Sequence, residues 1–267
     1  MAGLEIERDG RGGALVSRDG HPQSYVDLTD PANLAFEYVA QLACVIVVLA
    51  PSGPLRVTHV GGAGLTLPRW VAHTRPGSPQ IVLEPDAAMT EAVRRELPLP
   101  RGHRIRIRPV DGASGMADLA TGSADVVVVD AYAGGRVPAE LVTEGFLADC
   151  ARVVAGGGVL VANLADERGF GWVPRVAAGA RSAFGHVAWV ALTEVLRGRR
   201  FGNGVLVAMR DPVDTAELTR ALRRLPWPSG VRTDAELAAR TGGRRPFTVA
   251  DAVPSPEPPD PGRWRVG

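Results

Sequence analysis

The 267-residue sequence predicts an α/β protein: a Rossmann-like, mostly parallel sheet with helices on both faces, preceded by a small N-terminal β-hairpin region. Two observations lead to this prediction. Between residues 55 and 164, short apolar runs alternate with longer amphipathic stretches, as strands and crossover helices do in parallel sheets. The first 28 residues instead contain closely spaced glycine turns, which are typical of antiparallel hairpins.

The N-terminal region is expected to form short strands over residues 4–28. Asp9-Gly10 and Asp19-Gly20 break these strands, and Asp-Gly is a strong hairpin signal. Asp30 and Pro31 then predict the N-cap and the first residue of a helix that continues through the apolar stretch at 34–50. This stretch is shorter than the roughly 20 residues of a bilayer span, so we interpret it as a core helix.

The remaining elements follow from the alternation of apolar runs. The expected strands cover residues 55–60, 80–83, 104–110, 125–129 and 158–164. The expected helices are a stretch toward His73 and residues 87–97 and 140–154. Residues 186–192 and 204–209 are expected to add an antiparallel pair, and 211–223 one more helix.

The chain therefore divides into three parts: the β-hairpin region (1–30), the Rossmann-like core domain (31–225) and a tail (226–267). The tail is rich in proline and arginine, and we expect it to be extended or disordered.

Composition excludes several classes of protein. The formal net charge of +1 predicts no nucleic-acid partner through bulk electrostatics. All basic residues are arginine, which excludes a Schiff-base lysine and a phosphate-loop lysine. Cys44 and Cys150 are far apart in apolar runs and are expected to be buried free thiols. The first ten residues are charged and do not resemble a signal peptide, so we expect a cytoplasmic protein with no membrane partner.

Candidate ligand-binding residues stand at the ends of four successive expected strands. In open α/β sheets, ligands bind outside the carboxyl ends of the strands. The residues at these ends are Gly61, Gly62 and Gly64, then Glu84, then Asp111 and Gly112, and finally Asp130. This ordered series predicts a nucleoside site, because glycine lets a ligand approach the backbone and carboxylates accept hydroxyl and amine protons.

Each of these positions also has a purely structural interpretation. The glycines could form an ordinary tight turn. Glu84 follows Gly62 by 22 residues, a spacing at which an acid can accept both ribose hydroxyls. Asp111 could accept the exocyclic amine of adenine or cap the next helix. Asp130 ends the most β-branched strand, where burial can raise its pKa and let it accept a proton, or it could cap a loop.

With these residues in place, the sequence resembles the spermidine synthase-like (polyamine aminopropyltransferase) family, which has the class I S-adenosylmethionine-dependent methyltransferase fold. The resemblance covers about residues 13–210. Its most specific parts are Gln23-Ser24-Tyr25 and the acidic series of Glu84, Asp111 and Asp130.

The resemblance implies a role for each matching residue. It implies that Glu84 binds the ribose, that Asp111 binds the adenine end and that Asp130 orients and deprotonates the attacking amine. It also implies that Gln23 and Tyr25 border the cleft. Tyr132, beside Asp130, could line the acceptor pocket or pack in the core.

The sequence departs from the family at three places. The acid of the first glycine loop is replaced by Ala63, a second acid three residues after Asp130 by Ala133, and Tyr-His before the first long helix by Phe36-Glu37. In the family these acids hold cationic amines, and each lost charge-assisted hydrogen bond weakens binding by about 1.5–3 kcal/mol. Putrescine is therefore expected to be a poor acceptor.

The leading hypothesis is aminopropyl transfer from decarboxylated S-adenosylmethionine to a small amine or other nucleophile, not necessarily putrescine. Methyl transfer from ordinary S-adenosylmethionine is the runner-up, because Ala63 would not repel that donor's carboxylate. A non-catalytic nucleoside-binding homologue is the third. A nicotinamide oxidoreductase is disfavoured, since Leu67 occupies the third glycine position of the dinucleotide motif.

Two further expectations concern metals and assembly. The five histidines lack metal-ligand spacing, so no metal is expected. The hairpin-rich N-terminus could add to a neighbouring chain, which would give a homodimer.

Overall fold

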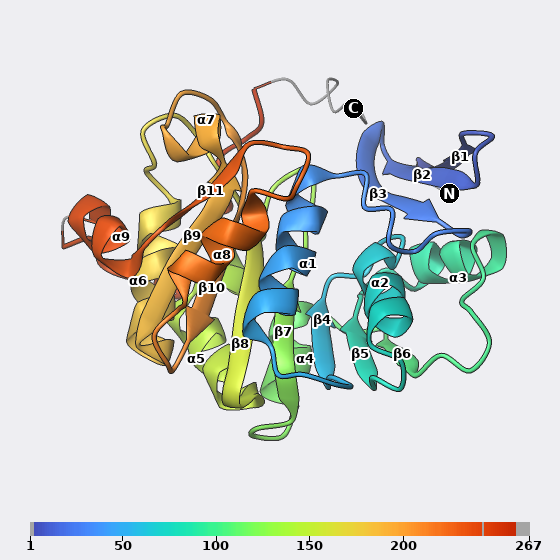
Figure 1. Cartoon of the computed structure of the whole chain (residues 1–267), viewed down its shortest axis with the longest axis horizontal. Coiled ribbons are helices and arrows are strands. Elements are labelled where there is room, and N and C mark those ends of the chain that lie inside the picture. Colours follow the sequence, from blue (N-terminus) through green and yellow to red (C-terminus); the bar gives the residue numbers. More distant parts are fainter. Residues whose placement is uncertain (1–2, 242, 260–267) are drawn as a thin grey trace.

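The computed structural model describes residues 3–241 and 243–259, which form a large mixed sheet covered by helices and a small separate sheet (Figure 1). The strands are β1 (Leu4–Arg8), β2 (Gly13–Arg18), β3 (His21–Asp27), β4 (Val57–Val60), β5 (Gln80–Leu83), β6 (Ile105–Arg108), β7 (Ala124–Val129), β8 (Val154–Asp166), β9 (His186–Leu192), β10 (Gly202–Met209) and β11 (Ser229–Arg232). The helices are α1 (Glu37–Leu49), α2 (Thr66–Thr74), α3 (Ala87–Glu96), α4 (Gly112–Ala117), the 3₁₀ helix η1 (Ala139–Val142), α5 (Glu144–Val153), α6 (Val173–Phe184), α7 (Thr193–Leu196), α8 (Thr215–Leu222) and α9 (Asp234–Thr241).

The large sheet has the strand order β11-β9-β10-β8-β7-β4-β5-β6. Strands β4 to β8 run parallel to one another, so their carboxyl ends meet at one edge. Strands β9, β10 and β11 pair antiparallel at the other side of the sheet. The predicted fold class is confirmed, including the small antiparallel sheet β1-β2-β3 that precedes the core.

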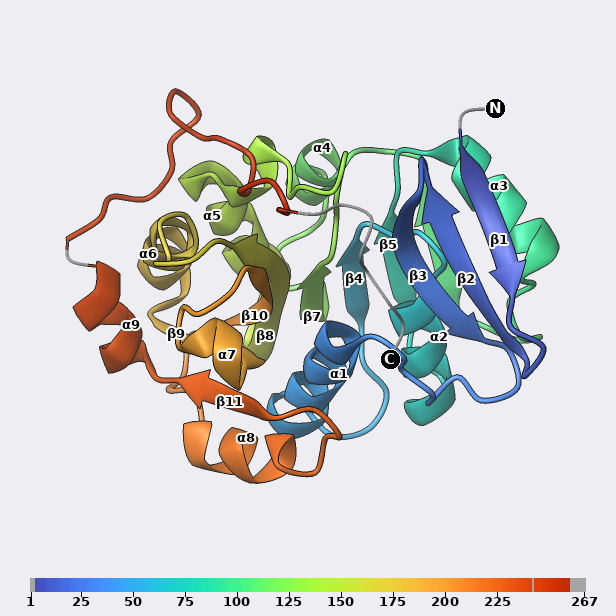
Figure 2. The same cartoon turned by 90° about the horizontal axis from the view of Figure 1, so that it is seen from above.

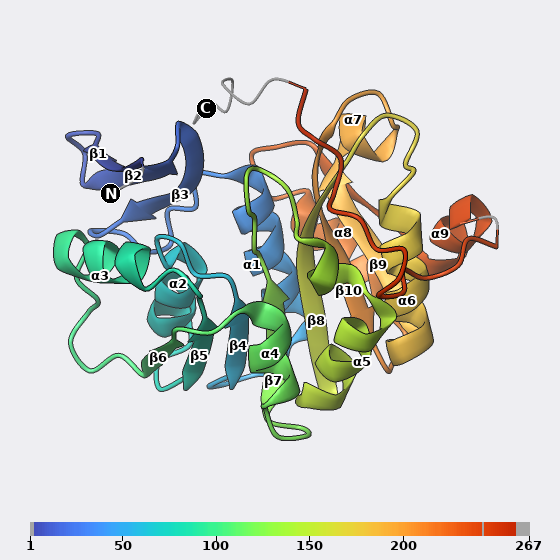
Figure 3. The same ribbon diagram turned by 180° about the vertical axis from the view of Figure 1, so that it is seen from behind.

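Helices cover both faces of the large sheet. Helices α1 and α8 lie over one face (Figure 1), and α4, α5 and α6 over the other (Figure 3). Successive valines of β7 point to opposite faces: Val126 and Val128 pack on the α1 side, and Val127 and Val129 on the α5 side. The run of valines in this strand follows from its burial on both faces.

Helices α4, α6 and α7 are not among the helices expected from the sequence, and two of the expected helices have other bounds. Helix α1 begins at Glu37 rather than at Pro31, because the Asp30 carboxylate accepts the backbone N–H of Ala32 at 3.0 Å in a turn of its own. The single helix expected at 140–154 is divided at Thr143, whose hydroxyl accepts the N–H of Phe146 at 3.2 Å and caps α5.

The C-terminal part is more ordered than the expected tail. Within it, β11 adds an edge strand beside β9, and α9 follows with Leu237 buried against the core. The expectation of an extended or disordered tail is therefore wrong for residues 229–241, since these residues gain strand pairing and apolar burial. Residues 260–267 of the expected tail lie outside the described residues. The division of the chain into three parts stays a prediction.

Residues 247–255, which we call the C-terminal strap, cross the face that carries α5 and α6 (Figure 3). Phe247 is buried, and its carbonyl accepts the N–H of Glu144 at 2.8 Å. Ser255 is fully buried, and its backbone N–H donates to the carbonyl of Val137 at 3.1 Å while its hydroxyl accepts the N–H of Val137 at 2.9 Å. The strap thus fixes the loop that connects β7 to η1.

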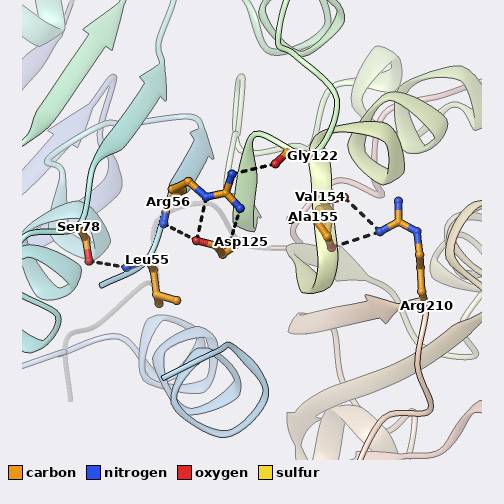
Figure 4. A network of polar contacts seen from close by, with 8 residues as sticks. All are labelled: Leu55, Arg56, Ser78, Gly122, Asp125, Val154, Ala155 and Arg210. Carbon is orange, nitrogen blue, oxygen red and sulfur yellow. Dashed lines mark hydrogen bonds and ion pairs between the residues drawn. The ribbon is translucent and has the colours of Figure 1, made fainter. Parts of the chain in front are cut away.

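A second set of polar contacts ties the strands together at their amino ends (Figure 4). The backbone N–H of Arg56 donates to the Asp125 carboxylate at 2.8 Å, and the Arg56 guanidinium donates to the carbonyl of Gly122 at 2.9 Å. Arg210 donates to the carbonyl of Val154 at 3.1 Å. These contacts connect β4, β7, β8 and the end of β10 opposite the carboxyl edge of the sheet.

Within the part of the chain that the structure describes, no helix has the length and apolar character needed to cross a membrane.

We predict that Ser255→Ala lowers the free energy of unfolding by about 1–3 kcal/mol, because it leaves the buried N–H of Val137 without an acceptor. Urea unfolding followed by circular dichroism measures the difference. The control is Ser52→Ala at an exposed site, which should change the free energy by less than about 0.5 kcal/mol. Equal effects of the two substitutions would show that the strap does not hold the loop.

Candidate active site

A cavity of about 780 Å³, the main cavity, lies at the carboxyl edge of the large sheet. Figure 2 looks down on this edge, with the small sheet beside α2 and α3. The wall is formed by residues from β3, from the loops after β4, β5, β6 and β7, and from β8, α1 and the start of β10. Sequence-distant residues meet here because the parallel strands all end on this side.

The loop after β4 approaches the cavity with its backbone. Gly61 and Gly62 line the wall. Gly61 has a φ of +89°, and a side chain there would also collide with the carbonyl oxygen of Asp130. Glycine is therefore required where β4 and β7 end side by side.

Gly64 lies in the same loop but contributes differently. Its N–H donates to the hydroxyl of Ser24 at 3.0 Å, and it packs against β3. Gly64 therefore anchors the loop to the small sheet and is not part of the cavity wall.

Glu84 follows β5 and is only 8% exposed. One carboxylate oxygen accepts the N–H of Gly62 at 2.9 Å, and the other accepts the N–H of Asp86 at 2.9 Å. Burial raises its pKa, while the hydrogen bonds from Gly62 and Ala63 oppose this shift. The carboxylate is thus held rigidly at the wall, in contact with the glycine loop.

Asp111 follows β6 and caps the next helix, which was one of the two interpretations of this residue. Its carboxylate accepts the N–H of Ser114 at 2.8 Å and caps α4, and this hydrogen bond lowers its pKa. The residue also lines the cavity, as does Gly112, where a side chain would collide with Val60. The exposed carboxylate has further lone pairs that face the solvent side of the cavity.

Asp130 follows β7 at the floor of the main cavity. Its carboxylate accepts one hydrogen bond, from the side-chain amide of Asn163 at 2.8 Å. Burial raises the pKa of Asp130 to about 6, and the bond from Asn163 opposes the shift. This shift agrees with the expectation from the sequence, and a carboxylate with such a pKa can accept a proton near neutral pH.

A polar network that sequence reasoning missed surrounds Asp130. The Asn203 amide donates to the side-chain oxygen of Asn163 at 3.2 Å and to the hydroxyl of Tyr132 at 3.4 Å. Tyr132 in turn donates to the backbone carbonyl of Asn163 at 3.4 Å. Asn163 could have been found as a polar residue inside the apolar run of β8, whereas no local pattern marks Asn203.

Tyr38 is a further residue that was not predicted. It comes from the first turn of α1 and lines the main cavity. Burial, with a contribution from the nearby Asp130, raises its pKa well above the ordinary value, so its hydroxyl stays protonated.

Gln23 and Tyr25 of β3 were both expected to border the cleft, but only one of them does. Gln23 lines the main cavity. Tyr25 does not, because its hydroxyl donates to the carboxylate of Asp9 at 2.5 Å and raises its own pKa to about 12 in doing so. The expectation that Tyr25 borders the cleft is wrong: it points to the hairpin side of β3.

The positions that lack the family's acids both face the cavity, since Ala63 and Ala133 are part of its wall. His59 also reaches the wall, but it is bonded through Nε2 to the side-chain oxygen of Gln80 at 2.8 Å. Burial lowers the pKa of His59 to about 4, which keeps the ring neutral. Among the described residues, no group of three or more histidine, cysteine or acidic side chains is arranged to hold a metal ion.

The chain is similar to known proteins in both sequence and structure. No family model matches the chain. The chain is 27% identical over 164 residues to a polyamine aminopropyltransferase of Chromobacterium violaceum, covering 61% of this chain and 62% of that protein. It is 25% identical over 142 residues to the polyamine aminopropyltransferase of a Neisseria meningitidis strain, covering 53% of each. The matches therefore span about three-fifths and about half of these relatives' lengths.

Solved structures extend the likeness over the whole chain. A probable spermidine synthase from Corynebacterium glutamicum superposes with a TM-score of 0.85 at 29% identity, covering 97% of this chain and 99% of that one. A spermidine synthase from Thermotoga maritima has a TM-score of 0.59 at 20% identity, covering 89% of this chain and 80% of that one. At that identity the second likeness concerns the fold alone.

The fold is that of the class I S-adenosylmethionine-dependent methyltransferases, extended by a small antiparallel sheet at the N-terminus. Within this class, the chain is spermidine synthase-like in both sequence and structure, as the resemblance implied.

We predict that Asp130→Asn stabilises the protein more at pH 7.5 than at pH 5. The folded-state pKa of about 6 lies above the ordinary value of 3.8, so the wild type loses stability as the pH rises from about 4 through 6. Removing the charge removes this loss, which amounts to about 1–3 kcal/mol over the full range.

Urea unfolding at the two pH values measures this difference. Asp211→Asn, at an exposed position, is the matched control and should show no such pH dependence. The same effect of Asp130→Asn at both pH values would contradict a desolvated carboxylate at this position.

Proposed function

We propose that the protein transfers an aminopropyl group from a decarboxylated S-adenosylmethionine donor to an amine acceptor. The observation that carries this proposal is Asp130: a carboxylate whose pKa burial raises to about 6, so that it can accept a proton, in the wall of a cavity whose other half would hold a nucleoside. The relatives named polyamine aminopropyltransferase and probable spermidine synthase support the choice of this chemistry.

The donor's nucleoside fits the half of the cavity formed after β4, β5 and β6. Glu84 would accept the ribose hydroxyls, because its oxygens keep free lone pairs beside the bonds from Gly62 and Asp86. Asp111 would accept the adenine amine. Gly61, Gly62 and Gly112 would let the nucleoside approach the backbone closely.

The reaction proposed at Asp130 is an in-line displacement. The acceptor's ammonium gives one proton to the Asp130 carboxylate and becomes a neutral amine. The amine's lone pair then forms a bond to the donor carbon beside the sulfonium, while the carbon–sulfur bond breaks and its electron pair goes to sulfur. Methylthioadenosine leaves as a neutral thioether. Asn163, which bonds Asp130 at 2.8 Å, would orient the carboxylate.

A second candidate is methyl transfer from ordinary S-adenosylmethionine. Ala63 in the cavity wall favours it, because an acid at this position would repel the carboxylate of that donor. Ala133 has a different consequence: with no acid there, the acceptor is less well held as a diammonium ion. A non-catalytic nucleoside-binding role is the third reading, and the retained Asp130 disfavours it.

We predict that Glu84→Ala weakens the binding of methylthioadenosine by at least about 1.5–3 kcal/mol, the effect of losing one hydrogen bond to a charged acceptor. Isothermal titration calorimetry measures the affinity, and thermal unfolding verifies that the variant is folded. Glu91→Ala, at an exposed position of α3, is the matched control and should leave the affinity unchanged. Unchanged affinity in a folded Glu84→Ala variant would remove the ribose assignment.

We predict that Asp130→Asn reduces the rate of aminopropyl transfer by about 10²–10⁴-fold, the usual effect of losing a general base. Binding of methylthioadenosine should be retained. The wild-type rate should rise with pH through about 6, as Asp130 loses its proton, and the variant should lack this rise. Full activity of Asp130→Asn would place the chemistry elsewhere in the protein.

A further inference from the structure

A second cavity of about 550 Å³ adjoins the main cavity on the side away from the nucleoside half. The two cavities share a wall made of Glu37, Arg200, Phe201 and Asn203. The far side of the second cavity is formed by Glu167 and Arg168, after β8, and by Glu257, Pro258 and Pro259. The half of the site that would hold the acceptor therefore extends beyond the main cavity into the second one, which is lined by charges of both signs.

Arg200 is the cation of the shared wall. The neighbouring Arg197 and Arg199 each bond to Glu194 at 3.3 Å. Arg200 is exposed at the wall of both cavities, and its guanidinium has no ion pair or hydrogen bond with any residue that the structure describes. An unpaired guanidinium at such a wall is a site for a carboxylate, which it can bind with two parallel hydrogen bonds.

Glu37 is the anion of the same wall. It is the first residue of α1, a position at which the helix favours a negative charge, and it likewise has no partner among the described residues. It stands where the related family has a histidine, so this chain has gained an acid near the acceptor half while lacking one at Ala133.

Asn203 adds an independent sign that a ligand group belongs at this wall. The residue is 9% exposed, and its amide nitrogen donates to the side-chain oxygens of Asn163 and Tyr132. Its side-chain oxygen is buried and has no donor within the described part of the chain. A buried acceptor without a donor is unfavourable, and an ammonium group at the wall would satisfy it if the Asn203 side chain turns its oxygen toward the cavity.

We propose that the acceptor is an α,ω-diamino acid rather than a diamine, an inference that rests on the proposed function. The reacting amine lies at Asp130, the second ammonium between Glu37 and Asn203, and the carboxylate on Arg200. The transfer step is the displacement described above: Asp130 takes one proton from the reacting ammonium, nitrogen bonds to the donor carbon, and the carbon–sulfur electron pair goes to sulfur.

A diamine fits the same wall less well. Its distal ammonium could pair with Glu37, but a diamine has no carboxylate for the guanidinium of Arg200, and the two positive charges would repel each other. L-Ornithine and putrescine form a matched pair for this comparison, because ornithine is putrescine with one added carboxylate.

The test is isothermal titration calorimetry of L-ornithine and putrescine with the full chain, saturated with methylthioadenosine. We expect ornithine to bind about tenfold or more tightly than putrescine, as one charge-assisted contact to Arg200 would produce. Arg200→Met should abolish this preference, and Glu37→Gln should weaken both ligands. Arg199→Met, whose guanidinium bonds to Glu194 instead, is the control and should keep the preference.

Tighter binding of putrescine, binding of neither ligand, or an unchanged preference in Arg200→Met would overturn the inference. Transfer assays with decarboxylated S-adenosylmethionine separate this failure from failure of the proposed function. If the protein converts putrescine but does not bind ornithine, the proposed function stands and the diamino-acid inference is wrong. Ornithine binding that depends on Arg200, with no transfer, leaves the diamino-acid site and removes the function. If methylthioadenosine does not bind, the same titrations on the protein alone decide the matter.

Discussion

The end of β7 is the point on which the rest of the site depends. Here the backbone carbonyl of Asp130 lies against Gly61, so that only glycine fits at the end of β4. Among the described residues, its side chain meets a single hydrogen-bond donor, Asn163 of the adjacent strand β8. A carboxylate with one amide partner in a partly buried setting keeps its proton to higher pH than a solvated one. The position of β7 between β4 and β8 thus sets both the geometry and the proton affinity of the proposed base.

Two sets of contacts hold this position from opposite ends of the sheet. At the amino ends, Arg56 and Asp125 join β4 to β7, and Arg210 joins the end of β10 to β8 (Figure 4). At the carboxyl ends, Ser255 of the C-terminal strap fixes the loop that follows Asp130 through Val137. The loop carries Tyr132 and Ala133, so the strap also shapes the acceptor half of the main cavity.

Much of this arrangement could be predicted from local patterns. Strand β5 matches its expected bounds, 80–83, because a short apolar run lies between a turn and a capped helix. Asp130 was identifiable because a run of valines can only be a strand buried on both faces, and its first polar residue must reach the ligand edge.

Other features could not be predicted, because they depend on contacts between distant segments. Asn203 of β10 bonds Asn163 in the neighbouring strand β8 and Tyr132 in the loop after β7, and Ser255 bonds Val137 at a separation of 118 residues. The proline-rich composition after residue 253 suggests disorder, yet buried Phe247 and Ser255 hold the strap to the core. The prediction for Tyr25 was wrong because strand alternation alone does not reveal that its hydroxyl donates to the carboxylate of Asp9, on the hairpin side of β3.

The fate of the sulfonium donor tests the central claim most directly. The full chain is incubated with decarboxylated or ordinary S-adenosylmethionine and a mixture of amines and amino acids, and the thioether products are identified by mass spectrometry. The account predicts methylthioadenosine together with an equal amount of an aminopropylated acceptor, formed from the decarboxylated donor. S-adenosylhomocysteine with a methylated acceptor, or no thioether from either donor while the folded protein binds methylthioadenosine, would contradict it.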